Sequence, residues 1–430
     1  MIYKSALRAY PFKRLEEIHR ADIVVGIPCY NNEKTIRHVI QMVTHGLNQH
    51  FKDFRSVIFI ADGGSTDDTR DVVKDFQIKP WQEEVITIYR GPAGKGSAFR
   101  AIFDAVRILN AKVCAVVDSD LRSITSDWVS FLIEPILMHG YEYVSPIYTR
   151  HKYDGTITNN IVYNLTRSLY GKQIRQPIGG EFAFDGRLAA FFLNEDVWDT
   201  DVARYGIDIW MTTMAVLHGN KICQARLGVK IHDAKDPASS LGPMFRQVIS
   251  TLFTMMEQNE DKWKHVKGSV PVPTFGPEIK LEPESVKVNL DNLISEFKLG
   301  YQHFGVLWKN LFCEECFSEI KRIYKLKPEK FIIPVEIWVK MLYELASIFH
   351  RWKANRKILL SMMVPLYLAR VASFVNRTRN MNSFQAEDLV EEQARIFEEN
   401  KDYLLEVWKK EDIDIDPNGA LNKKNKNSKQ

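Results

Sequence analysis

The chain has 430 residues, of which 45% are hydrophobic and 26% are charged, so it can bury a large core and is not globally disordered. This length predicts two or three domains. The 58 basic and 54 acidic residues leave a formal net charge of only +4, which gives no reason to expect a nucleic-acid-binding protein.

The first 21 residues contain no apolar stretch of the kind that a secretory signal has, so no such signal is expected. From there to about residue 255, short β-rich runs alternate with amphipathic helical stretches. Strands are predicted over residues 23–27, 57–61, 85–89 and 113–117, and helices over 33–44 and 97–109, with another helix ending at 76. This alternation predicts a parallel sheet with helices on both faces, which binds ligands at the carboxyl ends of its strands.

Polar turns follow the first two predicted strands. The segment 28–33 (PCYNNE) could hold a base or ribose, although a strand-to-helix turn capped by asparagine explains it equally well. After the second strand, Asp62 points toward the ligand edge and could accept a hydrogen bond from a uracil or a ribose hydroxyl. Thr66 is interpreted as a helix N-cap, and Asp67 and Asp68 as part of the same capping segment.

A glycine-rich loop, residues 90–96 (RGPAGKG), follows the third predicted strand and leads into a helix. The amino end of that helix can hold a phosphate group, and Lys95 adds a fixed positive charge. The flanking glycines let a ligand approach the backbone. The loop is not a P-loop, because the Walker spacing is absent and no Ser or Thr follows the lysine.

The fourth predicted strand ends in Asp118-Ser119-Asp120. Side chains two residues apart on a strand point to the same face, so we expect both carboxylates on one side. Two oxygen ligands at the end of a buried strand suit Mg²⁺ or Mn²⁺ carrying a phosphate group. A D-x-D sequence is common by chance, so the interpretation as a metal site depends on the neighbouring loops.

Three later residues are candidates for the functional site, and for each of them a purely structural role is the alternative. Glu181 follows two glycines and could face a sugar or small acceptor, or it could be a solvated turn residue. Asp208 lies near the start of a helix, where capping explains it as well. His232 ends a strand-like run; beside an acidic metal site it becomes a third ligand, whereas alone it would be an ordinary histidine.

From about residue 280 the pattern becomes helical. Helices are predicted over 286–299, 300–311, 317–324, 335–352, 357–376 and 383–408. The expected organisation is a first domain over 1–263, a Pro- and Gly-rich linker over 264–283, a helical domain over 284–415 and a disordered tail over 416–430. The apolar run 358–369 is too short to span a bilayer and is expected to be a core helix.

The five cysteines form an odd and sparse set, which indicates reduced thiols and a cytoplasmic location. Two of them form the sequence Cys313-Glu-Glu-Cys316 within a helical pattern. Without a second cysteine pair, packing on one helix face is favoured over zinc binding or redox chemistry.

The order PCYNNE, DGGSTDDT, GKG, DSD resembles that of nucleotide-sugar glycosyltransferases of the GT-A fold. The later blocks GGE and GID and the downstream histidine are similar to those of the retaining mannosylglycerate, glucosylglycerate and glucosyl-3-phosphoglycerate synthases. The resemblance covers residues 22–255 by motif and extends, less specifically, to PLYLARV in the helical part. It implies an α/β fold: a Rossmann-like, mostly parallel nucleotide-sugar-binding domain followed by an α-helical C-terminal domain.

The resemblance also implies roles on the donor side. Asp120 would bind Mg²⁺ or Mn²⁺ directly, and His232 would complete the metal site. The residues that it places around the base, ribose, sugar and diphosphate of the donor are Pro28, Tyr30, Glu33, Asp62, Lys95, Asp118 and Ser119.

On the reacting side, the resemblance implies that Glu181 and Asp208 contact the transferred sugar or the incoming hydroxyl and act in catalysis. The residues expected to bind the acceptor carboxylate are Arg150, Thr158, Gly179 and Gly180. No Glu-Asp pair stands where inverting relatives keep a general base, which fits a retaining enzyme. There is also no Q-x-x-R-W motif of a processive polysaccharide synthase.

The expected function is therefore metal-dependent transfer of glucose or mannose from a UDP-, GDP- or ADP-linked sugar to D-glycerate or 3-phosphoglycerate, with retention. The product would be a compatible solute or its precursor. A polyprenyl phosphate acceptor, a sugar-phosphate nucleotidyltransferase and a non-catalytic sugar-nucleotide-binding protein are the alternatives. PCYNNE stands where a nucleotidyltransferase has its glycine-rich signature, which counts against that enzyme class. Formation of a homodimer stays open at this point.

Overall fold

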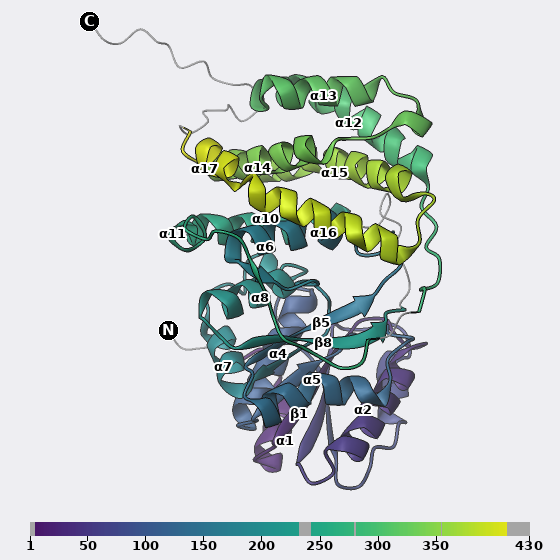
Figure 1. The fold of residues 1–430 in the computed structure, drawn as a ribbon. Coiled ribbons are helices and arrows are strands. Elements are labelled where there is room, and N and C mark those ends of the chain that lie inside the picture. Colours follow the sequence, from purple (N-terminus) through teal and green to yellow (C-terminus); the bar gives the residue numbers. More distant parts are fainter. Residues whose placement is uncertain (1–4, 232–241, 279–280, 354, 411–430) are drawn as a thin grey trace, which may run out of the picture. The chain divides into compact units, whose positions relative to one another are not determined.

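The computed structural model describes residues 5–231, 242–278, 281–353 and 355–410. The chain divides into two compact units, both built from discontinuous segments (Figure 1). The first unit comprises Met1–Arg150, Lys172–Ala234 and Val270–Glu284. The second comprises His151–Gly171, Lys235–Ser269 and Ser285–Gln430.

The first unit is built around an eight-stranded sheet with the order β10-β8-β5-β7-β4-β1-β2-β3. Its strands are β1 (Ile23–Cys29), β2 (Ser56–Asp62), β3 (Glu83–Ile88), β4 (Val113–Val116), β5 (Tyr143–Thr149), β7 (Phe182–Asp185), β8 (Ile222–Val229) and β10 (Thr274–Phe275). All pairings are parallel except those of β7, which runs antiparallel to β4 and β5. The expected mostly parallel α/β sheet is confirmed.

Helices cover both faces of this sheet because its strands are apolar on both sides. In β1, Ile23, Val25 and Ile27 share a core with α2 (Ile36–His50) and α5 (Ser126–His139). Successive side chains alternate between faces, so Val24 and Gly26 face the other side. There, a Cβ on Gly26 would lie 2.6 Å from Ile102 of α4 (Lys95–Ile108), so glycine lets this helix lie close to the strand.

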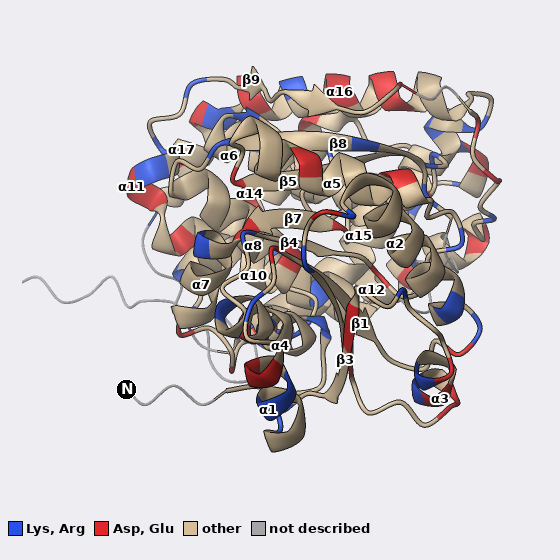
Figure 2. Ribbon diagram, turned by 90° about the horizontal axis from the view of Figure 1, so that it is seen from below, with Lys and Arg blue, Asp and Glu red and all other residues tan. Residues whose placement is uncertain are grey.

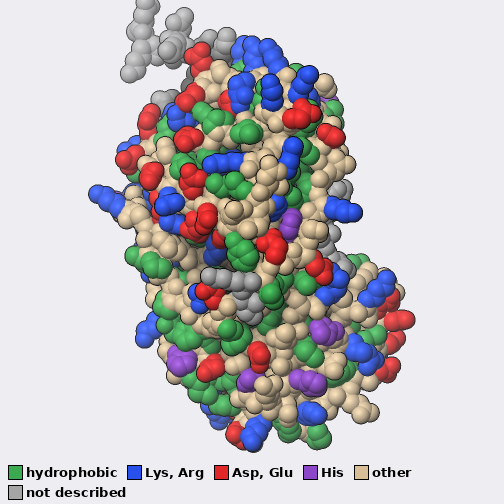
Figure 3. All heavy atoms as spheres, turned by 45° about the vertical axis from the view of Figure 1, so that its right-hand side comes forward, with side chains coloured by type: hydrophobic (Ala, Val, Ile, Leu, Met, Phe, Trp, Pro, Cys, Tyr) green, Lys and Arg blue, Asp and Glu red, His purple; other side chains and the backbone are tan. Residues whose placement is uncertain are grey.

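The remaining helices of the first unit are α1 (Ala9–Ile18), α3 (Thr69–Lys74), α7 (Gly186–Asn194) and α8 (Ile207–Leu217). An aromatic cluster joins α4, β7 and α7: the rings of Phe103 and Phe184 lie 5.3 Å apart, and those of Phe103 and Phe192 lie 5.7 Å apart. Acidic and basic residues are interspersed over the ribbon in Figure 2 and on the face drawn in Figure 3, in line with the small net charge.

The described part of the second unit is helical. It contains a π-helical turn (Thr158–Val162) and the helices α6 (Tyr163–Tyr170), α10 (Gly242–Gln258), α11 (Glu260–Trp263), α12 (Leu290–Leu311), α13 (Glu314–Tyr324), α14 (Val335–Arg351), α15 (Arg356–Thr378), α16 (Ser383–Glu399) and α17 (Lys401–Trp408). The expected helical C-terminal part is confirmed. The helix predicted over 383–408 is interrupted at Asn400, which separates α16 from α17.

The unit boundaries differ from those expected. Residues 151–171 and 242–263, placed in the first domain from the sequence, belong to the helical unit. The reason lies in the contacts of α6: Arg167 pairs with Glu391 of α16 at 2.7 Å, and Ser168 shares a hydrogen bond with Tyr343 of α14 at 3.0 Å. Part of the expected linker instead belongs to the first unit, where β9 (Val270–Pro271) pairs with β6 (Lys172–Gln173).

Among the described helices, α15 is the one long and apolar enough to cross a membrane by length and composition. The helix has 23 residues, so it extends well beyond the apolar run 358–369, and Pro365 lies inside it. However, 78% of its most apolar window is buried within the protein, as in a core helix. A Cβ on Gly300 of α12 would lie 2.3 Å from Pro365, so close helix packing surrounds this proline.

Candidate active site

Five charged side chains meet in the first unit: Lys95, Asp118, Glu181, Asp208 and Lys230, which we call the charged cluster. The Nζ atom of Lys95 lies 2.9 Å from Oδ1 of Asp118 and 3.3 Å from Oδ2 of Asp208. The Nζ atom of Lys230 lies 2.8 Å from Oε2 of Glu181 and 3.5 Å from Oδ2 of Asp118. Asp118 therefore connects the two lysines.

Sheet topology explains why these residues meet. Asp118 and Lys230 follow the carboxyl ends of β4 and β8, and Lys95 opens α4 after β3. Glu181 precedes β7, and because β7 is antiparallel its amino end lies at the same edge as the carboxyl ends of its neighbours. Asp208 lies in the first turn of α8. All five are therefore at the edge where such sheets bind ligands.

Two glycines allow close approach in or beside the cluster. Gly180 has a φ of +102°, and a Cβ there would lie 2.4 Å from Oδ2 of Asp118 and 2.9 Å from Nζ of Lys230. A Cβ on Gly96 would lie 1.8 Å from the carbonyl oxygen of Val202. Larger residues at either position would displace the backbone or the charged groups.

The electrostatics of the cluster are set by burial and by the two lysines. Burial alone would raise the pKa of Asp118, but the ammonium groups of Lys95 and Lys230 bring that pKa well below its usual value. Burial acts against the charge of Lys95, yet Asp118, Asp208 and Glu181 raise its pKa overall. Burial raises the pKa of Glu181 and of Asp208, only partly offset by the lysines. Asp118 and Lys95 thus form a charged pair.

Glu181 and Asp208 differ in what their oxygens contact. Glu181 is fully buried and accepts hydrogen bonds from Tyr148, from Lys230 and, at 3.4 Å, from the backbone N–H of Asp118. Asp208 is also buried, but its Oδ1 has no hydrogen-bond partner among the described residues. A buried acceptor without a donor is costly, so Oδ1 of Asp208 is the atom of the cluster that is ready to accept a ligand hydroxyl.

Comparison with known proteins identifies the class of this region. The model of glycosyl transferase family 2 matches residues 24–198. This chain is a glycosyltransferase. The matched range contains three members of the charged cluster, Lys95, Asp118 and Glu181. No curated protein sequence matches the chain significantly.

Several solved structures are similar to the glycosyltransferase. Glucosyl-3-phosphoglycerate synthase from Mycobacterium tuberculosis, in complex with Mg²⁺ and UDP, is 23% identical over 59% of this chain and 85% of that chain, with a TM-score of 0.43. The same enzyme with Mn²⁺, UDP and glucosyl-3-phosphoglycerate is 24% identical over 59% and 86%, with a TM-score of 0.43. A mycobacterial protein is 25% identical over 58% and 79%, with a TM-score of 0.42.

In the glycosyltransferase, Asp62 is fully buried at the end of β2. It accepts hydrogen bonds from the hydroxyl of Ser65 at 2.5 Å and from the backbone N–H groups of Gly64 and Ser65 at 3.1 Å. These bonds close the loop after β2. The carboxylate therefore shapes this loop instead of pointing into solvent.

The loop after β1 is bonded to the loop after β2. The carboxylate of Glu33 accepts from the backbone of Asp68, and the backbone N–H of Glu33 donates to Asp67, both at 3.2 Å. Asp68 is the N-cap of α3, two residues after the expected Thr66, and its side chain makes no capping bond. Pro28 is buried in β1, whereas the side chain of Tyr30 is 59% exposed and can contact a ligand.

The chain leaves the strand one residue earlier than expected, because β4 ends at Val116; Asp118 follows it, and residues 119 and 120 form a turn. Ser119 donates to Oδ1 of Asn32 at 2.8 Å, which ties this turn to the loop after β1. Asp120 is partly exposed, and its side chain has no hydrogen bond or ion pair to another described residue. Its carboxylate is thus available to a metal ion. His232 lies outside the described residues.

Of the residues expected to bind the acceptor, three lie together. Arg150 donates to the carbonyl oxygen of Gly179 at 3.3 Å, next to Gly180. Thr158 belongs to the π-helical turn of the other unit and is buried there.

The sequence alone does not single out Lys230 or Tyr148, the two partners of Glu181. Lys230 is 8% exposed and also donates to the carbonyl oxygen of Gly179 at 2.9 Å. The sequence offers one indication of Lys230: it is a basic residue in a strand-like run, two residues before the candidate ligand His232. Tyr148 belongs to β5, whose place beside β7 follows from the sheet order.

Proposed function

We propose that this glycosyltransferase is a cytoplasmic, metal-dependent, retaining hexosyltransferase that moves glucose or mannose from a nucleoside-diphosphate sugar to D-glycerate or 3-phosphoglycerate. The observation that carries the proposal is the convergence of Lys95, Asp118 and Asp208 at the carboxyl edge of the sheet. The product would be a glycosylglycerate that serves as a compatible solute or its precursor. The GGE and GID blocks, which supply Glu181 and Asp208, support this reaction class.

Lys95 is suited to stabilise the diphosphate leaving group. It is the first residue of α4, so a phosphate at this position also meets the amino end of a helix. Its ammonium group is held between two carboxylates before any ligand arrives, and a preorganised charge needs little rearrangement as the leaving group gains charge.

The donor set fits a divalent cation. Asp120 offers a carboxylate that no described residue occupies, and oxygen ligands suit Mg²⁺ and Mn²⁺. Asp120, with His232 of the undescribed segment, would hold the ion. When bound, Mg²⁺ or Mn²⁺ supplies Lewis-acid stabilisation of the diphosphate.

The contacts of the two candidate catalytic carboxylates favour different roles. Glu181 is saturated by Lys230, Tyr148 and the backbone of Asp118, so it orients the cluster. Asp208 keeps a buried acceptor, which can bind a hydroxyl of the sugar or of the acceptor. The saturated contacts of Glu181 and the hydroxyl-binding role of Asp208 support attack from the face of the leaving group, with the leaving phosphate accepting the proton of the incoming hydroxyl. Arg150, beside Gly179, would bind the acceptor carboxylate.

The test is a matrix of donors and acceptors assayed with Mg²⁺, with Mn²⁺ and with EDTA. UDP-, GDP- and ADP-linked glucose and mannose are each combined with D-glycerate and 3-phosphoglycerate, and release of the nucleoside diphosphate is measured. We expect one donor and acceptor pair to dominate, activity to vanish with EDTA, and NMR of the product to show a retained anomeric configuration.

Three results would contradict parts of this proposal. Inversion at the anomeric carbon would exclude the retaining mechanism, and full activity in EDTA would exclude the metal. If a polyprenyl phosphate gave a product that partitions into organic solvent, and neither D-glycerate nor 3-phosphoglycerate gave a product, the proposed acceptor would be wrong and a polyprenyl phosphate would take its place. No turnover with any pair would favour a sugar-nucleotide-binding protein.

A further inference from the structure

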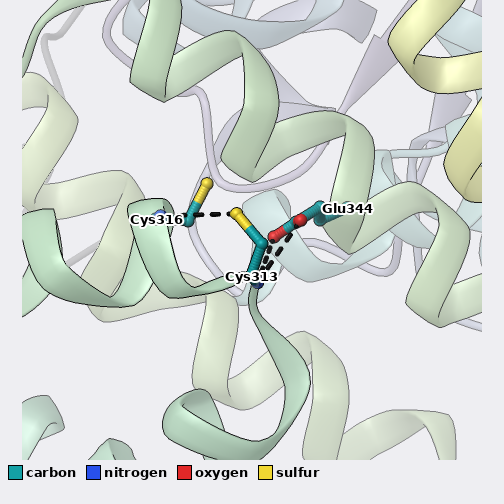
Figure 4. A group of neighbouring side chains, drawn as sticks. All are labelled: Cys313, Cys316 and Glu344. Atoms are coloured by element: carbon teal, nitrogen blue, oxygen red, sulfur yellow. Dashed lines mark hydrogen bonds between the residues drawn. The ribbon is translucent and has the colours of Figure 1, made fainter.

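Three side chains of types that can bind a metal lie together in the helical unit: Cys313, Cys316 and Glu344 (Figure 4). The two sulfur atoms and one carboxylate oxygen all lie within 4.8 Å of one another. Cys313 is the N-cap of α13, Cys316 lies in its first turn, and Glu344 lies in the middle of α14. The cluster thus joins the start of one helix to the side of another.

The backbone at this helix start favours sulfur ligands. The N–H of Cys316 donates to Sγ of Cys313 at 3.4 Å. Two thiolates with this Cys-x-x-Cys spacing are a common half of a tetrahedral Zn²⁺ site, and a carboxylate is an accepted further ligand.

Glu344 provides the independent observation. Its side chain is buried, and among the described residues no Lys or Arg forms an ion pair with it. It accepts a hydrogen bond from the hydroxyl of Tyr403 at 2.5 Å and from the backbone N–H of Cys313 at 3.2 Å. Buried carboxylates are normally paired with a cation or bound to a metal, so a cation beside the two thiols would supply the missing charge.

We propose that Cys313, Cys316 and Glu344 form a Zn²⁺ site that fastens the start of α13 to α14. Tyr403 of α17 is the positioning residue, because its hydroxyl orients the carboxylate of Glu344 toward the cysteines. Cys313 is partly exposed, so a water molecule can reach the fourth position. The site shares no residue with the proposed transferase site. A disulfide between the two cysteines is the competing chemistry, and it would leave the buried charge of Glu344 uncompensated.

The test uses the full chain, equilibrated with Zn²⁺ in the presence of excess Mg²⁺ and a reductant and then desalted. We expect one Zn²⁺ per chain by elemental analysis, and thiolate-to-metal charge-transfer absorption when Co²⁺ replaces it. Cys316→Ala should lose both signals. Cys223→Ala is the matched control, because it removes another fully buried thiol outside the cluster and should keep them. Asp120→Ala should also keep them, which separates this site from the transferase metal.

Two further variants keep the test informative if Cys316→Ala does not fold. Glu344→Gln retains the shape of the side chain and one oxygen that can accept a hydrogen bond from Tyr403, but it removes the charge. We expect it to bind Zn²⁺ more weakly than Tyr403→Phe and the two control variants. Tyr403→Phe should weaken Zn²⁺ binding about 10- to 100-fold. Zn²⁺ affinity unchanged in Glu344→Gln, no Zn²⁺ in the wild type, or a Cys313–Cys316 disulfide that persists when Zn²⁺ is supplied would each overturn the proposal.

Discussion

At the scale of single residues, the site depends on how buried charges are compensated. Three carboxylates and two lysines form the charged cluster, and each lysine contacts two of the carboxylates. Removal of one partner from such a group leaves a buried charge without solvent or a counter-ion. The cost of that unpaired charge is much larger than the net stabilisation that the ion pair provides. Stability and activity are therefore coupled at these residues.

The pair Lys230 and Glu181 tests this coupling through stability. We expect Lys230→Met to lower the free energy of unfolding by about 3–5 kcal/mol, because Glu181 remains buried without its cation. The double variant Lys230→Met/Glu181→Gln should lose less than the sum of the single variants in denaturant unfolding. Additive losses would show that the two side chains do not interact.

Lys95 tests the catalytic side. Lys95→Met should lower kcat about 100- to 1,000-fold, the loss typical when one preorganised group that stabilises developing charge is removed. Lys112→Met is the control, since Lys112 forms a surface pair with Asp22 at 3.0 Å, away from the cluster. Steady-state kinetics with circular dichroism distinguishes a loss of chemistry from a loss of fold. Equal rates in both variants would exclude the role assigned to Lys95.

At the scale of elements, backbone geometry at a few turns positions the site. The loop between β6 and β7 places Gly179, Gly180 and Glu181 against Asp118 and Lys230. Gly180 is suited to this place for two reasons: its left-handed backbone conformation, and the lack of room for a Cβ. The loop therefore holds Glu181 where its carboxylate can accept a hydrogen bond from the backbone N–H of Asp118.

Gly180→Ala should therefore abolish most activity, because the new Cβ would collide with Asp118. Gly140→Ala is a matched control: Gly140 also has positive φ, +69°, but nothing lies within 4 Å of its Cβ position. Both variants should lose some thermal stability from backbone strain. Only Gly180→Ala should lose turnover, measured as release of the nucleoside diphosphate. Equal activities of the two variants would show that a Cβ at position 180 does not disturb the active site.

Glu84 in strand β3 makes the stability of the fold depend on pH. Burial raises the pKa of Glu84 to about 7, and no residue in the described part of the chain forms a hydrogen bond with its Oε2. The folded state thus binds this proton more tightly than the unfolded state, so the stability contributed by the protonated form is lost as pH rises from about 4.5 toward 7. Glu84→Gln should raise Tm relative to wild type at pH 8 but not at pH 4. The control Glu83→Gln, which affects an exposed pair with Arg14, should not show this pH dependence.

At the scale of the whole molecule, the chain crosses between two units more than once. The segment 151–171 leaves the first unit and packs among helices that come more than 170 residues later: Trp338 donates to the carbonyl oxygen of Asn160 at 2.9 Å, and Lys401 to that of Ser168 at 2.9 Å. The helical unit is thus assembled from three separate parts of the sequence.

Truncation after residue 284 tests this organisation. It would leave α6 and α10 without the helices α14–α17 that cover them, and both carry buried apolar residues. We expect the shortened chain to aggregate or to bind a dye for exposed apolar surface. A chain that ends at residue 410 keeps every described helix and should remain folded by circular dichroism. A well-folded 1–284 chain would contradict the division into these units.

The sequence by itself determined the first four strands of the sheet and the change to a helical second half, and it supplied most of the candidate site residues. Those strands were recognisable because each is a local apolar run followed by a polar or glycine-rich turn, and β1 to β4 lie within a residue or two of the expected ranges. Lys95, Asp118, Glu181 and Asp208 were recognisable because of the turns and helix starts that carry them. Such signals depend only on neighbours along the chain.

Only the tertiary structure decided which of these residues meet. The antiparallel insertion of β7 between β4 and β5 brings Glu181 to Asp118, and β8, next to β5, brings Lys230 to both. The buried contacts of Asp62, the second segment of the helical unit and the meeting of Glu344 with Cys313 and Cys316 are decided in the same way. Each depends on contacts between residues distant in sequence, and local periodicity carries no information about such pairings.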